Sequence, residues 1–111
     1  MKKTMFAVLS LSLIALGARA EVDKKTERTW KAKCASCHGA DGKAATDQGK
    51  KLSIPDYTSA EVQKSKTDDQ LKSAISNGIK NDKGGEMEGY KDKLSGEEIE
   101  NLVKLVRSFG K

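Results

Sequence analysis

The chain has 111 residues, enough for one small domain, and with 33% charged residues it buries little apolar surface by itself. Its formal net charge is +5, but a nucleic-acid partner would require clustered basic residues and aromatic platforms, and only 5% of the residues are aromatic. The charge is therefore no indication of nucleic-acid binding, and we expect no such partner.

The first twenty residues have the composition of a secretory signal. Lys2 and Lys3 precede an apolar stretch at residues 5–17, and Ala18-Arg19-Ala20 supplies a small-x-small cleavage site. Cleavage after residue 20 removes three basic residues and no acidic one, so the basic count falls from 21 to 18 against 16 acidic residues, a net charge of +2. The apolar stretch is shorter than the about 20 residues that span a bilayer. We therefore expect a mature domain of residues 21–111 without stable membrane insertion, and a retained amphipathic anchor is the alternative.

A helix is predicted over residues 22–33, and it runs directly into the motif Cys34-Ala-Ser-Cys37-His38. The spacing C-x-x-C-H is typical of covalent haem attachment, because two thiols can add to the two vinyl groups of one porphyrin while the histidine binds the iron. The chain has two cysteines and one histidine, and all three lie in this motif. The sequence therefore predicts one haem c, bound through Cys34 and Cys37, with His38 as an axial iron ligand.

Three other interpretations of the motif are weaker. A structural zinc site needs four ligands, and the chain offers only three thiol or imidazole groups. A redox C-x-x-C of the thioredoxin kind accompanies a βαβ pattern, and no run of residues is convincing as a strand. A disulfide between Cys34 and Cys37 would close a very small loop and stabilise the fold little.

Two further helices are predicted later in the chain. A capping box at Thr67 and Gln70 predicts a helix that ends at Gly78, and a second at Ser95 and Glu98 predicts one that ends near the C-terminus. Apolar residues follow the helical period in both, at Leu71, Ala74 and Ile75 in the first and at Ile99, Leu102, Val103, Val106 and Phe109 in the second. We therefore expect an all-α fold.

The segments between these helices are rich in glycine and lysine. Residues 39–53 and 81–93 are expected to be loops, and residues 59–64 are compatible with one extra turn of helix. Long structured loops in a compact domain are usually functional, so the loop at residues 81–93 is a candidate for the second side of the haem.

The candidate for the second axial ligand is Met87. Haem iron is commonly held by one histidine and one methionine, and removal of the signal discards Met1 and Met5. Met87 lies in a glycine-rich loop rather than on an apolar helical face, which favours a ligand over a core residue. The competing ligands in this region are Lys80, Lys83, Lys91 and Tyr90.

With these features the chain resembles the small single-haem class I c-type cytochromes of bacteria, over essentially all of residues 21–111. The resemblance implies three main helices and loops wrapped around one covalent haem. In that family the first and last helices cross closely. Trp30 matches the aromatic position on the first helix, Thr26 stands where glycine is usual, and Leu102 and Leu105 match their counterparts on the last helix.

Three loop residues are interpreted through the same resemblance. Pro55 matches a proline whose carbonyl oxygen accepts a hydrogen bond from the ring N–H of the iron-binding histidine, while a proline that merely ends a loop is the alternative. Tyr90 matches an aromatic position that shields the haem edge. The chain departs from the family directly after Met87, where Glu88 replaces the usual proline.

An iron with two protein ligands has no open position for a substrate, so the resemblance implies a one-electron carrier rather than an enzyme. We expect a periplasmic monomer that shuttles electrons between periplasmic or membrane-bound redox proteins through transient contacts. Several loop lysines could steer these contacts: Lys43, Lys50, Lys51, Lys80, Lys83 and Lys91. A merely solvated surface explains these lysines equally well. If Met87 does not bind the iron, the same domain would be a haem-based sensor or ligand-binding module.

Overall fold

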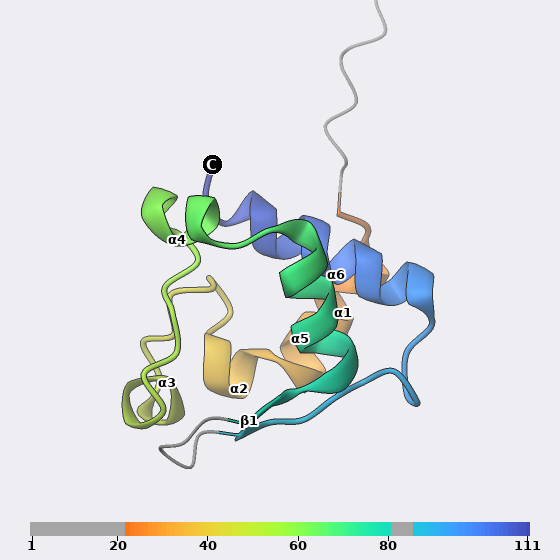
Figure 1. Ribbon diagram of the computed structural model, residues 1–111, viewed down its shortest axis with the longest axis horizontal. Helices are drawn as coiled ribbons and strands as arrows, with labels where there is room; N and C mark the ends of the chain where they lie inside the picture. Colours follow the sequence, from red (N-terminus) through yellow and green to blue (C-terminus); the bar gives the residue numbers. More distant parts are fainter. Residues whose placement is uncertain (1–21, 81–85) are drawn as a thin grey trace, which may run out of the picture.

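The computed structural model describes residues 22–80 and 86–111 (Figure 1). The predicted signal at residues 1–20, and Lys83 with the centre of its loop, lie outside the described residues. The elements in chain order are α1 (Lys24–Lys33), α2 (Ala35–His38), α3 (Asp47–Lys51), α4 (Ala60–Ser65), α5 (Asp68–Asn77), β1 (Ile79–Lys80), β2 (Glu86–Met87) and α6 (Gly96–Ser108). The mostly helical fold and its three longest helices, α1, α5 and α6, confirm the prediction.

Side-chain caps explain where these three helices begin. Both predicted capping boxes are present, at Thr67 with Gln70 in front of α5 and at Ser95 with Glu98 in front of α6. Asp23 caps α1 with its side-chain oxygen. Each cap satisfies backbone N–H groups that have no partner within the first helical turn, so the helix starts are determined locally.

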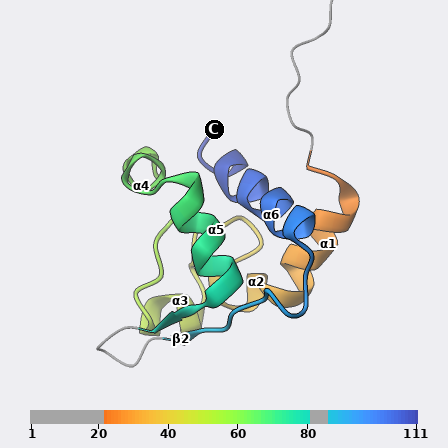
Figure 2. The ribbon, with the colours of Figure 1, turned by 45° about the vertical axis from the view of Figure 1, so that its right-hand side comes forward.

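The core lies where α1 and α5 pack against α6 (Figures 1 and 2). Trp30 on α1 is 4% exposed, and its ring centroid lies 5.1 Å from that of Phe109 at the end of α6. Thr26, which stands at the expected glycine position, is also buried, as are Leu102 and Leu105 on α6. The predicted meeting of the first and last helices is therefore confirmed.

Within the described part of the chain, no helix is long and apolar enough to cross a membrane.

Two features of the connecting segments were not predicted. The segment expected as a loop over residues 39–53 contains α3, which begins where the Thr46 hydroxyl accepts a hydrogen bond from the Gly49 N–H. The expectation that the chain has no strand was wrong, because β1 and β2 form a two-stranded antiparallel sheet in which Ile79 pairs with Met87. Strands of two residues are too short to show an alternating pattern in the sequence.

Candidate functional site

The motif Cys34-Ala-Ser-Cys37-His38 folds as a short helix directly behind α1. Cys34 ends α1 by donating its backbone N–H to the Trp30 carbonyl, at 2.8 Å, and begins α2. The His38 N–H then donates to the Cys34 carbonyl at 2.9 Å, one turn later. The first hydrogen bond joins the motif to α1, and the second closes a helical turn within it.

The imidazole of His38 lies between two aromatic rings. Its centroid is 5.5 Å from that of Trp30 and 5.7 Å from that of Tyr57, on which it stacks at 23°. Burial lowers the pKa of His38, so the ring is neutral at neutral pH. Its Nδ1 atom is buried without a hydrogen-bond partner among the described residues. The expected hydrogen bond between this ring and the Pro55 carbonyl is therefore not present.

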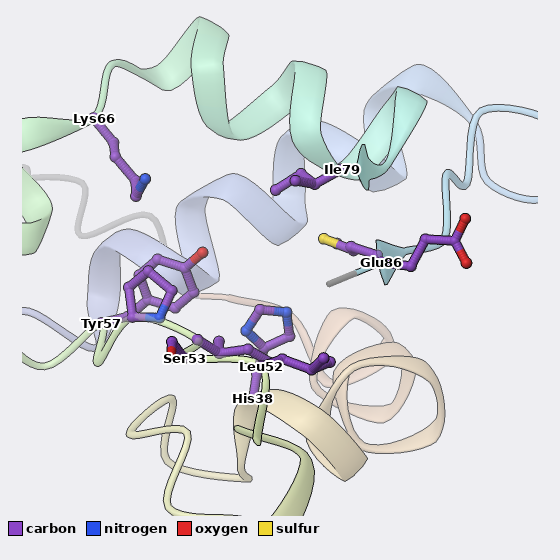
Figure 3. A pocket seen from close by; sticks show the side chains of 10 residues that line it. His38, Leu52, Ser53, Tyr57, Lys66, Ile79 and Glu86 are labelled. Carbon is purple, nitrogen blue, oxygen red and sulfur yellow. The ribbon is translucent and has the colours of Figure 1, made fainter. Parts of the chain in front are cut away.

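An open, largely apolar cleft of about 160 Å³ lies over this ring (Figure 3). We call it the His38 cleft; its lining residues are His38, Leu52, Ser53, Ile54, Pro55, Tyr57, Lys66, Ile79, Glu86 and Met87. A second, smaller cavity of about 20 Å³ shares His38, Tyr57 and Met87 with this cleft, and its lining also includes Trp30 and Cys34. The fold thus brings together four of the residues singled out in the sequence, with Pro55 at the edge of the wider space.

Met87 enters this site from β2 rather than from an irregular loop. The residue is half-buried and pairs across the sheet with Ile79. Gly78, at the end of α5, has a φ of 77°, and a Cβ atom there would lie 2.3 Å from the Met87 carbonyl oxygen. This close approach fixes the Met87 backbone beside the end of α5.

The two remaining sequence candidates do not line the His38 cleft. Cys37 is half-buried, and its carbonyl accepts a 2.6 Å hydrogen bond from the Thr46 hydroxyl. The hydroxyl of Tyr90 donates to the Lys33 carbonyl at 3.2 Å, and its backbone N–H donates to the Ile75 carbonyl at 2.8 Å. Tyr90 therefore fastens the segment after Met87 to α1 and α5.

Two cleft residues were missed at the sequence level. Tyr57 covers the His38 ring because its backbone N–H donates to the Gly42 carbonyl at 2.9 Å. The sequence does single out Tyr57 as an isolated aromatic residue in a polar segment, two residues after Pro55, and this position could have indicated a role in the site. Lys66 also lines the cleft, and nothing in its sequence context distinguishes it from the other lysines. Of the competing lysines, Lys80 and Lys91 are exposed and do not line the cleft.

The alternatives to haem find little support in this arrangement. Within residues 22–80 and 86–111, no three histidine, cysteine or carboxylate side chains cluster in a way that could hold a metal ion. Cys34 and Cys37 are both free thiols, so no disulfide joins them. Burial raises the pKa of Cys34 to about 11, so its sulfur is a protonated thiol at neutral pH rather than a reactive thiolate of the thioredoxin kind.

A helical fold around a cleft that has a C-x-x-C-H motif at its base defines a c-type cytochrome. Residues 21–106 match the family described as cytochrome C oxidase, cbb3-type, subunit III, and the chain belongs to this cytochrome c family. Membership implies haem-based electron transfer, and the chain is a small electron carrier rather than an enzyme.

Solved structures agree with this assignment. The KustC0563 c-type cytochrome is 31% identical, superposes with a TM-score of 0.67, and aligns over 78% of this chain and 98% of its own. A variant of it with one tyrosine replaced by phenylalanine is also 31% identical, with a TM-score of 0.64 over 76% of this chain and 96% of its own. No curated protein matched the chain.

Proposed function

We propose that the mature domain, residues 21–111, carries one haem c attached through Cys34 and Cys37, with His38 and Met87 as the axial ligands of the iron. The domain acts as a periplasmic carrier that passes single electrons between redox proteins. The observation that carries this proposal is that His38 and Met87 line one largely apolar cleft, and that both also line a neighbouring cavity together with Cys34.

The residues of the cleft fit a porphyrin. The His38 ring is half-buried and neutral, and its buried Nδ1 atom has no hydrogen-bond partner among the described residues, which suits an imidazole that donates a lone pair to a metal ion. Leu52, Ile54 and Pro55 give the cleft an apolar wall, as a flat hydrocarbon ring requires. A haem bound here would supply a one-electron Fe(III)/Fe(II) couple.

The thioether of Met87 suits the second ligand position because it is soft and uncharged. Histidine and methionine together raise the reduction potential of a haem, since the thioether favours the ferrous state. Of the lysines that could compete with Met87 for the iron, Lys80 and Lys91 lie in the described part of the chain, and neither lines the cleft. The pairing of Met87 with Ile79 holds the ligand segment in place without help from the usual following proline.

Electron transfer needs one edge of the haem to be accessible to a partner. Ile79, which lines the cleft, is 46% exposed and is the largest exposed hydrophobic side chain among the described residues. An apolar residue at the rim suits the small, weak and transient contacts that redox partners make. We therefore place the docking point at the Ile79 side of the cleft.

The attachment and the export are tested together on material from the periplasm. We expect a mature chain that begins at Glu21, a mass equal to polypeptide plus one haem, and a c-type absorption spectrum. The variant with both Cys34→Ser and Cys37→Ser should lose covalent haem, whereas Ser36→Ala, an exposed position between them, should retain it. Colourless wild-type protein with the mass of bare polypeptide would contradict the proposal.

The axial ligand is tested separately with Met87→Ala. This variant should lose the weak long-wavelength charge-transfer band of methionine-bound ferric haem while keeping its covalent haem. Ile79→Ala, on the paired strand, is the control and should keep the band. If the band is absent from the wild type and carbon monoxide binds readily to its ferrous form, the domain is instead a ligand-binding or sensing module.

A further inference from the structure

Lys66 is a cationic side chain set into the His38 cleft. The residue is half-buried and lines both this cleft and an adjoining cavity of about 360 Å³ beneath α5. Figure 3 shows its side chain extending from the chain above the cleft toward Tyr57. The other charged cleft residue is Glu86.

No carboxylate in the described part of the chain pairs with this lysine. Among the described residues, none of the ion pairs includes Lys66. The carboxylate of Glu86 lies 3.7 Å from the Lys80 ammonium and is turned away from the cleft (Figure 3). A charge that is partly removed from water without a partner is unfavourable, so this position suits a cation whose partner belongs to a bound molecule.

The backbone of Lys66 is held firmly from the opposite helix. The Arg107 guanidinium on α6 donates a 2.6 Å hydrogen bond to the Lys66 carbonyl and another, also of 2.6 Å, to the Gln63 carbonyl. Its Nε atom also donates to the Asp68 carboxylate at 2.7 Å. Arg107 thus clamps the connection between α4 and α5, and the Lys66 side chain is directed to the cleft by a rigid support.

We propose that the Lys66 ammonium is the counter-ion of a haem propionate, and that its charge raises the reduction potential of the iron. The proposal rests on the proposed function, since it requires a haem in the His38 cleft. A propionate is a carboxylate carried by the ligand itself, and it supplies the anion that the described residues do not. Reduction adds one negative charge to the haem, so a nearby cation favours the ferrous form.

The test measures the reduction potential of holoprotein variants. Lys66→Gln should favour the ferric form by about threefold to tenfold in the redox equilibrium, the upper figure being about 59 mV for a one-electron couple. Lys66→Glu should shift it further, and Lys66→Arg, which keeps the charge, should stay close to the wild type. Lys64→Gln is the matched control, because Lys64 is exposed, lies in the same segment and does not line the cleft.

Three results would overturn the proposal. The first is a Lys66→Gln potential that moves no further than that of Lys64→Gln. The second is a Lys66→Arg potential that shifts as much as Lys66→Gln, because the effect would then be structural. The third is a change in the iron-ligand bands of Lys66→Gln, which would make Lys66 an iron ligand. Each of these leaves the covalent haem intact, so it is distinguishable from failure of the proposed function, in which the wild type has no haem.

Discussion

The indole Nε1–H of Trp30 donates a buried hydrogen bond of 2.9 Å to the carbonyl oxygen of Gly39, the residue that directly follows His38. Because Cys34 also donates to the Trp30 carbonyl, the Trp30 residue holds both ends of the C-x-x-C-H motif. The position matched to an aromatic of the family therefore does more than fill space between α1 and α6. It fixes the segment from which His38 projects.

Trp30→Phe is expected to destabilise the holoprotein by about 0.5–1.5 kcal/mol, because the Gly39 carbonyl loses one of its two donors and keeps only the Gly42 N–H at 3.2 Å. Denaturant unfolding followed by helical circular dichroism measures the change. Lys31→Ala, at an exposed neighbouring position, serves as the control and should stay within about 0.5 kcal/mol of the wild type. Equal stability of the two variants would show that the hydrogen bond is not needed.

The parts of the fold that could be predicted from the sequence are those whose cause is local. The capping boxes before α5 and α6 and the helical period within α6 are properties of neighbouring residues, and both predicted helices are present. The short elements α3 and β1 depend in addition on contacts with residues further along the chain. The start of α3 depends on Thr46, whose hydroxyl donates to the distant Cys37 carbonyl, and β1 depends on pairing with β2.

The same distinction applies to the site. The C-x-x-C-H motif could be recognised because its chemistry resides in five consecutive residues, and the fold does place Cys34, His38 and Met87 around one space. Lys66 and Tyr57 could not be assigned, because their places in the cleft depend on contacts with Arg107 and Gly42 that are distant in sequence. The prediction that the His38 ring N–H donates to the Pro55 carbonyl was wrong, because the resemblance supplies a residue match but not the local backbone path.

Gly78→Ala is expected to loosen the ligand segment. The φ of 77° with a ψ of 179° is a conformation that only glycine adopts readily, and the added Cβ would meet the Met87 carbonyl oxygen at 2.3 Å. We expect a loss of stability of about 1–3 kcal/mol and a weakened methionine–iron band in the ferric spectrum.

The control for this substitution is Gly96→Ala. Gly96 is the first residue of α6, and a Cβ atom there has no neighbour within 4 Å. This variant should be as stable as the wild type or up to about 1 kcal/mol more stable, because alanine reduces the freedom of the unfolded chain. A Gly78→Ala protein that behaves like Gly96→Ala would show that Met87 does not depend on the close approach of Gly78.

Arg107→Gln is expected to destabilise the holoprotein by about 1.5–3 kcal/mol, because the half-buried carbonyls of Gln63 and Lys66 lose a charged donor. Lys104→Gln removes the same charge from an exposed position on the same helix and should change stability by less than about 0.5 kcal/mol. Chemical unfolding of the two variants in parallel distinguishes the loss of the Arg107 hydrogen bonds from the loss of one positive charge on α6. If both lose the same stability, the clamp between α6 and the α4–α5 connection is not significant.

The stability that the Asp23 cap gives to α1 is expected to depend on pH. Hydrogen bonds from the Thr26 hydroxyl and backbone N–H lower the pKa of Asp23 below its ordinary value of 3.8. A carboxyl with a lowered pKa in the folded state stabilises the fold above pH 3.8, and this contribution is lost as the pH falls through the folded pKa. Asn can accept the same capping hydrogen bonds but carries no charge.

Asp23→Asn should therefore be less stable than the wild type at neutral pH, and the difference should close as the pH falls below 3.8. Free energies of unfolding of the holoprotein across this range measure the effect. Asp92→Asn is the control, because Asp92 is exposed and makes no hydrogen bond or ion pair with the described residues. A stability difference for Asp23→Asn that stays constant with pH would mean that the charge of Asp23 does not contribute, and that the cap acts through its geometry alone.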